Sequence, residues 1–346
     1  MENHDSFMLR CLELASKGKN QVSPNPMVGS VIVYENKIIG EGYHQAFGGP
    51  HAEVNAIKNV ENKSLLKKAT LYVNLEPCSH HGKTPPCCNT IVEYGIPNVV
   101  IGSGDPNEKV NGKGIDFLKK NNVNVINNIL KEKAEELNRK FYTFHKHKRP
   151  HITLKWAETI DGYIDKNRKS SNTKEVNWIT TENTKTLVHQ WRSEHDAILV
   201  GRKTIENDNP SLTVRLVKGK NPLRIVIDPL LKLSNYFDIF KDEHPLIILN
   251  EKIDKSKGKI KYLKFDKNNL LNTINSFLYQ NKIQSLLVEG GAKTIDSFLK
   301  EGNWDEAKVL IGNKKFSDGL LAPKIKASPI SIKTHGQDKL ISYRND

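Results

Sequence analysis

Short apolar runs alternate with helical patterns along most of the chain, and this alternation is what most restricts the fold. Strand-like runs such as Val28–Tyr34, Thr70–Leu75 and Ala197–Gly201 are separated by amphipathic segments such as Ser6–Lys17 and Asn183–His195. Strands that are separated by helices pack as layered α/β sheets, because each element must bury its apolar face against another layer. The sequence therefore predicts an α/β fold.

The alternation is interrupted by a basic segment without periodicity, His145–Pro150. A chain of 346 residues is too long for one typical domain and suits two. We therefore expect two α/β domains, at residues 1–146 and 150–346. A single charged amphipathic helix is expected over 130–144, directly before the boundary.

The net charge of +14 raises the question of a nucleic-acid partner. The excess comes mostly from Lys residues scattered along the chain, and no basic stripe with interleaved aromatic residues stands out. We therefore expect no nucleic-acid partner, whereas a basic surface suits phosphorylated small substrates. No apolar run approaches the roughly 20 residues of a membrane helix, and the polar start Met1–Arg10 is not a secretory signal. We expect a cytoplasmic protein without a membrane partner; the sequence leaves the oligomeric state open, a homo-oligomer included.

Three of the four cysteines crowd beside histidines, which indicates a metal site rather than a disulfide scaffold. The segment Pro50–Glu53 offers one imidazole, and the run after it offers the thiolates of Cys78 and Cys87. Catalytic zinc takes three protein ligands and keeps the fourth position for water. We expect His51, Cys78 and Cys87 to hold zinc, with Glu53 close enough to move protons without binding the metal.

A closed, structural zinc site is the alternative, with Cys88, His80 or His81 as a fourth ligand. Cys88 follows Cys87 in the same predicted helix and should point about 100° away from it. A closed site would also leave Glu53 without a role. The open site resembles those of zinc deaminases, although eight residues separate Cys78 from Cys87 where the general signature has two.

Longer stretches make this resemblance specific. Ser23–Val33, His51–Glu53 and Glu76–Cys88 look like the deaminase domain of the bifunctional deaminase/reductase family of riboflavin biosynthesis. Ser103–Asn107 and Val110–Gly114 fit the same family, and the longer spacing between the cysteines is one of its features. The resemblance implies a cytidine-deaminase-like three-layer α/β/α domain.

The resemblance also implies a reaction and further site residues. The domain would hydrolytically deaminate 2,5-diamino-6-(5-phosphoribosylamino)pyrimidin-4-one. Zinc lowers the pKa of a bound water to about 7, and Glu53 would pass its proton to the ring nitrogen and then to the departing amine. By the resemblance, Asn25 contacts the pyrimidine ring, and His80 and Lys83 face the ribose phosphate.

The second half lacks the Gly-x-Gly-x-x-Gly fingerprint of a Rossmann domain. Instead, a predicted strand at Ser285–Glu289 runs into Gly290-Gly291 and a helical pattern. Paired glycines let a phosphate approach backbone N–H groups at the start of a helix, although such a pair is usually just a turn. A second segment, Ala197–Arg215, places basic and hydroxyl groups after another strand.

Together these segments resemble the reductase half of the same family, a dihydrofolate-reductase-like α/β domain that uses NADPH to reduce the ribosyl group to ribityl. Matching stretches include Lys155–Ala157, Trp178–Thr180 and Asp208–Arg215. The resemblance implies that the dinucleotide is contacted by Ala157, Trp178, Thr204, Asp208, Gly291, Ala292, Lys293, Thr294, Ile295, Asp296 and Ser297. It implies that the substrate is contacted by Arg192, Leu212, Arg215 and Glu289. Arg192 and Arg215 suit a phosphate clamp, because guanidinium binds phosphate bidentately.

The second half also departs from the family in places. Val176 stands two residues before Trp178, where the family has Ser, and the stretch Lys166–Glu175 is longer and more polar than usual. The part after Gly312 matches poorly. An alternative interpretation of the whole chain is a nucleic-acid or nucleoside deaminase with a non-catalytic second domain.

Overall fold

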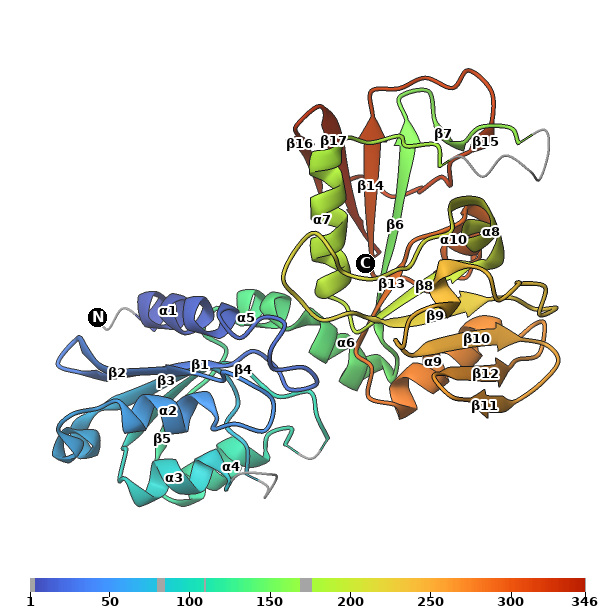
Figure 1. Ribbon diagram of the computed structural model, residues 1–346. Helices are drawn as coiled ribbons and strands as arrows, with labels where there is room; N and C mark the ends of the chain where they lie inside the picture. Colours follow the sequence, from blue (N-terminus) through green and yellow to red (C-terminus); the bar gives the residue numbers. More distant parts are fainter. Residues whose placement is uncertain (1–3, 80–84, 109, 169–175, 346) are drawn as a thin grey trace. The chain divides into compact units, whose positions relative to one another are not determined.

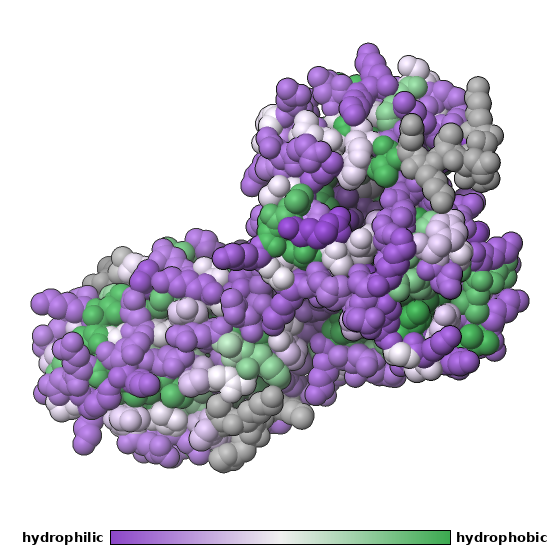
Figure 2. Space-filling view, viewed as in Figure 1, coloured by the Kyte–Doolittle hydropathy of each residue, from purple (hydrophilic) through white to green (hydrophobic). Residues whose placement is uncertain are grey.

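The computed structural model describes residues 4–79, 85–108, 110–168 and 176–345. It divides into two compact units, Met1–Lys148 and Arg149–Asp346 (Figure 1). Within the described ranges, no helix has the length and apolar character that crossing a membrane requires. On the face shown in Figure 2, hydrophilic residues cover most of both units, and apolar residues form scattered patches.

The first unit contains one mixed sheet with the strand order β2-β1-β3-β4-β5. β1 pairs antiparallel with β2 and β3, whereas β3, β4 and β5 run parallel. The strands are β1 (Gly29–Tyr34), β2 (Lys37–Tyr43), β3 (Thr70–Leu75), β4 (Asn98–Ser103) and β5 (Asn124–Ile126). The helices are α1 (His4–Ser16), α2 (Ala52–Lys58), the 3-10 helix η1 (Lys63–Lys68), α3 (Cys87–Glu93), α4 (Lys113–Lys120), α5 (Lys131–Leu137) and α6 (Arg139–His147).

Side chains that alternate along these strands fill a separate core on each face of the sheet. Ile32 and Val73 belong to the core that α2, α3 and α4 cover, whereas Val31 and Tyr72 belong to the core that α1 covers. This is the period of two that a sheet buried on both faces requires. The predicted three-layer α/β/α architecture is confirmed.

Helix α2 packs closely on strand β2 because two strand positions are glycine. A Cβ on Gly42 would lie 2.3 Å from the Ala56 nitrogen, and one on Gly40 would lie 2.6 Å from the Ala56 carbonyl oxygen. Any larger residue would push the helix outward. Since α2 begins directly after His51, this contact fixes the position of a predicted metal ligand.

The single helix that was predicted over 130–144 is in fact two helices, α5 and α6. Between them the Asn138 side chain accepts a hydrogen bond from the Met27 N–H (2.8 Å) and donates one to the Met27 carbonyl (2.9 Å). This tertiary contact outweighs the continuous helical pattern. Helix α6 continues to His147, so the first half of the basic segment His145–Pro150 is helical.

The second unit is built on a ten-stranded sheet with the order β11-β12-β10-β9-β8-β13-β6-β14-β17-β16. Its strands are β6 (His151–Thr159), β8 (Ala197–Gly201), β9 (Leu223–Ile227), β10 (Leu246–Asn250), β11 (Lys255–Lys257), β12 (Ile260–Lys264), β13 (Ser285–Val288), β14 (Glu306–Gly312), β16 (Ser331–His335) and β17 (Asp338–Arg344). A separate pair is formed by β7 (Tyr163–Asp165) and β15 (Leu320–Leu321). The helices are α7 (Glu182–Ser193), α8 (Arg202–Asp208), the 3-10 helix η2 (Asp238–Phe240), α9 (Leu270–Gln280) and α10 (Ala292–Lys300).

The strands from β12 to β14 run parallel, and helices cover both faces of the sheet. Helices α9 and α10 pack on one face, over a core that includes Leu199 and Val288. Helices α7 and α8 pack on the other, against residues such as Val200 and Leu287. The predicted dihydrofolate-reductase-like α/β architecture is confirmed. The poorly matching part after Gly312 contributes β17, which pairs antiparallel with β14.

Candidate functional sites

The three predicted zinc ligands meet at one point of the first unit. His51 lies directly before α2, Cys78 follows the end of β3, and Cys87 begins α3. Their ligand atoms all lie within 4.8 Å of one another. His51 Nδ1 lies 3.2 Å from Cys87 Sγ and 3.6 Å from Cys78 Sγ. Residues from three elements thus converge into one cluster.

The geometry and chemistry of this cluster fit zinc. Bonds of about 2.0–2.3 Å at tetrahedral angles place neighbouring ligand atoms about 3.5 Å apart, close to the two distances above. Hydrogen bonding to Cys87 lowers the pKa of the Cys78 thiol, and the imidazole of His51 adds to the effect. A thiolate, which is the form that binds metal, is therefore favoured at this position.

Glu53 lies in the first turn of α2, beside the cluster, and is 3% exposed. Its Oε2 atom has no hydrogen-bond partner within the described residues. Burial raises the pKa of this carboxyl group. A buried carboxylate oxygen without a protein partner is costly unless another molecule uses it.

Cys88 points away from the cluster. Its Sγ contacts the carbonyl oxygens of Pro77 (3.3 Å) and Gly114 (3.6 Å). Burial raises the pKa of its thiol far above the usual range. Its position does not favour the alternative with Cys88 as a fourth ligand; His80 and His81, the other two candidates, lie outside the described residues.

Asn25 contacts His44, a histidine that lies against the predicted zinc ligand His51 and that the sequence analysis did not identify. Its amide nitrogen is 3.1 Å from His44 Nε2, and His44 Nδ1 contacts the Pro50 carbonyl at 3.0 Å. The His44 and His51 rings lie 5.4 Å apart, edge to face. A histidine directly after β2 was the available signal. The other predicted substrate residues of this domain, His80 and Lys83, lie outside the described residues.

A buried carboxylate anchors the neighbouring loop. Glu76, at the end of β3, accepts hydrogen bonds from the backbone N–H groups of Asp105 (3.2 Å), Gly112 (3.0 Å), Gly114 (2.9 Å) and Ile115 (3.3 Å). Asp105 in turn accepts from the Asn107 N–H at 2.7 Å. Burial raises the pKa of Asp105 to about 7, and the charge of Glu76 adds to this.

The raised pKa of Asp105 predicts a pH-dependent stability. The folded unit holds the proton more tightly than the unfolded chain, so Asp105 stabilises the fold at acidic pH. This contribution is lost as pH rises from about 4 to about 7, by about 1.4 kcal/mol per pH unit. Asp105→Asn should remove that slope from the unfolding free energy of the zinc-loaded chain, measured by denaturant titration between pH 5 and 8. The exposed Asp116→Asn is the control, and equal slopes in both variants would contradict the prediction.

In the second unit, two strand ends bring glycines and hydroxyl groups together. The Gly201 N–H donates to the Gly290 carbonyl at 2.9 Å, which joins the ends of β8 and β13. A Cβ on Gly201 would lie 2.7 Å from Thr294 Oγ1, and one on Gly291 would lie 3.5 Å from Thr204 Oγ1. Glycines beside the start of α10 leave backbone and hydroxyl groups that a dinucleotide phosphate can approach, so this group fits NADPH.

The other predicted dinucleotide residues have different surroundings. The segment after Gly291 forms the first turns of α10, as the helical pattern there predicted. Ile295 is fully buried in the core, and the Ser297 hydroxyl donates to the Thr294 carbonyl. Trp178 is 52% exposed, with the Lys185 ammonium 3.5 Å from its ring centroid. The remaining predicted dinucleotide residues lie on three elements. They are Ala157 on β6, Asp208 at the end of α8, and Ala292, Lys293 and Asp296 on α10.

Asp208 lies beside an arginine from the polar stretch that distinguishes this chain. Arg168 Nη2 is 3.5 Å from Asp208 Oδ1, and the same guanidinium binds Asp165 at 2.8 Å. Burial raises the pKa of Asp208 to about 6, although Arg168 opposes this. Residues 169–175 of the stretch lie outside the described ranges, and Val176 is 36% exposed.

A buried ion pair joins two of the predicted substrate residues. Arg192 donates to both carboxylate oxygens of Glu289, at 2.8 and 2.7 Å, and Lys155 Nζ lies 3.8 Å from the same carboxylate. Burial alone would raise the pKa of Glu289, but the two cations lower it to about 2. The sequence predicted Lys155 only as part of a matching stretch. A lysine in the buried strand β6 was the signal that could have singled it out.

Leu212 and Arg215 lie on a segment that reaches this ion pair. The Thr213 carbonyl accepts from Arg192 Nη1 at 3.4 Å, and the Arg215 N–H donates to His189 Nδ1 at 3.0 Å. Leu212 is 1% exposed and packs in the core, so only its backbone is available. Glu289 holds two nitrogens of Arg192, whereas the exposed Arg215 contacts the Thr213 hydroxyl through Nη1.

Comparison with known proteins extends these observations to the whole chain. Residues 1–103 match the cytidine and deoxycytidylate deaminase zinc-binding region, and residues 150–316 match the RibD C-terminal domain. The riboflavin biosynthesis protein RibD of Aquifex aeolicus is 39% identical over 98% of this chain and 98% of its own length. A solved Thermotoga maritima structure, described as a diaminohydroxyphosphoribosylaminopyrimidine deaminase/5-amino-6-(5-phosphoribosylamino)uracil reductase, is 37% identical. Its TM-score is 0.86, over 99% of this chain and 98% of that one. The Acinetobacter baumannii RibD structure is 28% identical with a TM-score of 0.87, over 98% of each chain.

A zinc-type deaminase domain followed by a reductase domain places the protein in the class of two-domain, bifunctional enzymes. Because the similarity to its relatives spans nearly the full length, the chain belongs to the RibD family of riboflavin biosynthesis proteins. It is a deaminase and a reductase, with zinc and NADPH as cofactors. The alternative of a non-catalytic second domain is not favoured, because that domain matches the family too.

Proposed function

We propose that residues 1–146 deaminate 2,5-diamino-6-(5-phosphoribosylamino)pyrimidin-4-one and that residues 150–346 reduce the ribosyl group of the product to ribityl. The observation that carries the proposal is the cluster of His51, Cys78 and Cys87, with an oxygen of Glu53 beside it that has no partner among the described residues. The Thermotoga maritima relative is described by the same pair of activities. Asn25, His80 and Lys83 are the proposed substrate residues of the first domain.

In the deamination, His51, Cys78 and Cys87 hold zinc, which when bound supplies a Lewis acid that makes water acidic near neutral pH. Glu53 Oε2 accepts a proton from the attacking water. The same atom gives this proton to the ring nitrogen, then takes the remaining proton of the hydroxyl group that has been added to the ring and gives it to the amino group. Water is consumed, ammonia leaves and a carbonyl group remains on the ring.

In the reduction, NADPH supplies the hydride, and the protein supplies orientation and charge. The glycines and hydroxyl groups at the ends of β8 and β13 suit the dinucleotide phosphates. Lys155 and Arg192 keep Glu289 ionised, so that its carboxylate can accept hydrogen bonds from the sugar hydroxyls. The exposed guanidinium of Arg215, with Arg192 beside its segment, takes the substrate phosphate.

A single assay tests both activities. The purified zinc-loaded chain is supplied with the phosphorylated diaminopyrimidinone and NADPH, and ammonia release and NADPH oxidation are followed together. We expect ammonia to appear without NADPH and NADPH oxidation to require the deaminated product. Failure of either reaction in the folded, zinc-loaded chain would contradict the corresponding half of the proposal.

Arg215→Ala separates the two ligands of the reductase. Because the substitution removes a charged contact to the substrate phosphate, the KM for the deaminated substrate should rise at least about tenfold. The Kd for NADPH should stay within about twofold. Steady-state kinetics and calorimetry measure the two quantities, and weakened NADPH binding with an unaltered substrate KM would reassign Arg215 to the dinucleotide.

We further propose a cytoplasmic location and no nucleic-acid partner. The scattered distribution of lysines and the small phosphorylated substrate support both. Salt-dependent RNA binding in a filter assay would contradict the second statement. The proposal is compatible with a homo-oligomer, and light scattering measures the oligomeric state.

A further inference from the structure

A fully buried arginine of the second unit holds the segment that carries Arg215. Arg224, on strand β9, is 0% exposed. Its guanidinium donates to both carboxylate oxygens of Asp242, at 2.9 and 2.7 Å. It also donates to the carbonyl oxygens of Ser211 (3.1 Å) and His244 (2.6 Å). One side chain thus ties segment 211–215 to the turn 242–244.

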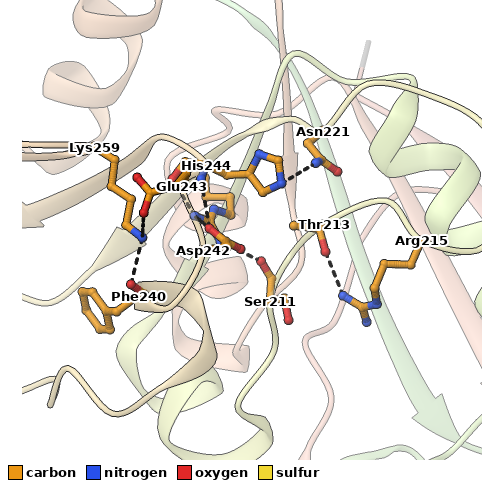
Figure 3. A network of polar contacts seen from close by, with 10 residues as sticks. Ser211, Thr213, Arg215, Asn221, Phe240, Asp242, Glu243, His244 and Lys259 are labelled. Atoms are coloured by element: carbon orange, nitrogen blue, oxygen red, sulfur yellow. Dashed lines mark hydrogen bonds and ion pairs between the residues drawn. The ribbon is translucent and has the colours of Figure 1, made fainter.

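A second side chain makes the same link. Asn221 accepts a hydrogen bond from the Val214 N–H at 2.7 Å, and its amide nitrogen lies 3.0 Å from His244 Nε2. Figure 3 shows Asn221 and His244 pointing toward one another, and Thr213 pointing toward Arg215. Turn 242–244 therefore supports segment 211–215 at two points, Ser211 and Val214.

The far side of the segment is held by helix α7. His189 accepts from the Arg215 N–H, and Arg192 donates to the Thr213 carbonyl, as described above. Backbone groups of four of the five residues from 211 to 215 are thus bound by side chains from other elements. Because these hydrogen bonds fix the backbone of segment 211–215, the contacts of Arg224 also help to determine where the exposed Arg215 guanidinium lies.

Core packing alone does not explain a charge at position 224. Desolvating a guanidinium costs several kcal/mol, which pairing must offset, and an apolar residue would fill the same space without that cost. The neighbouring strand positions Ile225, Val226 and Ile227 are apolar and buried. An apolar side chain could not, however, bind the Ser211 carbonyl and Asp242 together. The charge therefore serves to fix the backbone.

We propose that Arg224 and Asp242 are positioning residues of the reductase. They fix segment 211–215 so that Arg215 and Arg192 can bind one phosphate group of the substrate together. This inference rests on the proposed function of the second domain. Neither residue needs to touch the phosphate: the pair of the buried Arg224 and the half-buried Asp242 acts by fixing the backbone that carries the phosphate-binding side chain.

Asp242→Asn tests this inference, with Glu243→Gln as the matched control. Both variants neutralise one carboxylate of the same turn, but the side chain of Asp242 is 33% exposed and that of Glu243 is 97% exposed. In the full chain, Asp242→Asn should raise the KM for 5-amino-6-(5-phosphoribosylamino)uracil about tenfold. The KM for NADPH, the reductase kcat and ammonia release should stay within about twofold, because only phosphate binding is disturbed. Glu243→Gln should match the unaltered chain.

A merely structural role would give a different result. It would lower the active fraction, and hence the apparent kcat, with both KM values unchanged, and that outcome would overturn the inference. So would an unaltered substrate KM in a folded Asp242→Asn variant. If this variant unfolds in the assay, Asn221→Ala removes the exposed second link and should raise the same KM.

The proposed function can fail separately. If the unaltered, folded chain does not oxidise NADPH with the deaminated substrate, the reductase proposal is wrong. Titration with ribose 5-phosphate would then still test the inference. The Kd should rise about tenfold in Asp242→Asn and not in Glu243→Gln, and equal Kd values in both variants would overturn it.

Discussion

Glu53→Gln is expected to lower deamination by about 10²–10⁴-fold and to leave the reductase untouched. Glutamine keeps the size and polarity of the side chain but cannot accept a proton at neutral pH, and general acid–base groups contribute about this factor. Zinc should stay bound, because Glu53 is not one of the three clustered ligands. Ammonia release measures the loss, and metal analysis measures the zinc.

The same variant tests whether the two reactions are independent. No residue assigned to deamination is also assigned to reduction, so Glu53→Gln should reduce the deaminated intermediate, supplied directly, at close to the unaltered rate. Conversely, Gly291→Val should block the approach of the dinucleotide while ammonia release continues. Loss of reduction in folded Glu53→Gln would show that the sites are not independent.

Cys87→Ser is expected to lose its zinc, and its deaminase activity should fall at least about 100-fold. A serine hydroxyl is a poor zinc ligand, and even residues that only support a ligand cost 10–100-fold when they are replaced. Inductively coupled plasma measurement of zinc per chain, alongside ammonia release, checks both effects.

Cys88→Ser is the matched control for this variant. The two cysteines are adjacent, but the Cys88 thiol contacts the carbonyls of Pro77 and Gly114 instead of the cluster. A serine hydroxyl can donate to the same carbonyls, so metal and activity should be retained. Loss of zinc in Cys88→Ser would favour the closed-site alternative.

Local patterns predicted much of the fold because the central elements are long and regular. Strands β3 and β8 have the predicted bounds, Thr70–Leu75 and Ala197–Gly201. The break at Asn138 could not be predicted, because it depends on Met27, which is 111 residues away in the chain. The short pair β7 and β15 has too few residues to show a period of two.

The metal cluster was easier to predict from the sequence than the reductase site was. His51, Cys78 and Cys87 could be proposed from chemistry, because few residue types bind zinc and their spacing is informative. For Lys155 and His44 the sequence signal is weak, because only the fold brings a single lysine or histidine next to its neighbours. The Arg192–Glu289 pair, 97 residues apart, was expected as two separate substrate contacts and is one ion pair.

The strand order of the second unit has a consequence for synthesis on the ribosome. β6, its first strand, pairs with β13 and β14, which are made near the end of the chain. The first unit needs only residues up to Lys148 and can fold while the rest is still being translated. The nascent chain therefore carries β6 without either neighbour until residue 285 has emerged. A message truncated before codon 306 would yield a chain whose deaminase folds and whose β6 keeps an open, aggregation-prone edge.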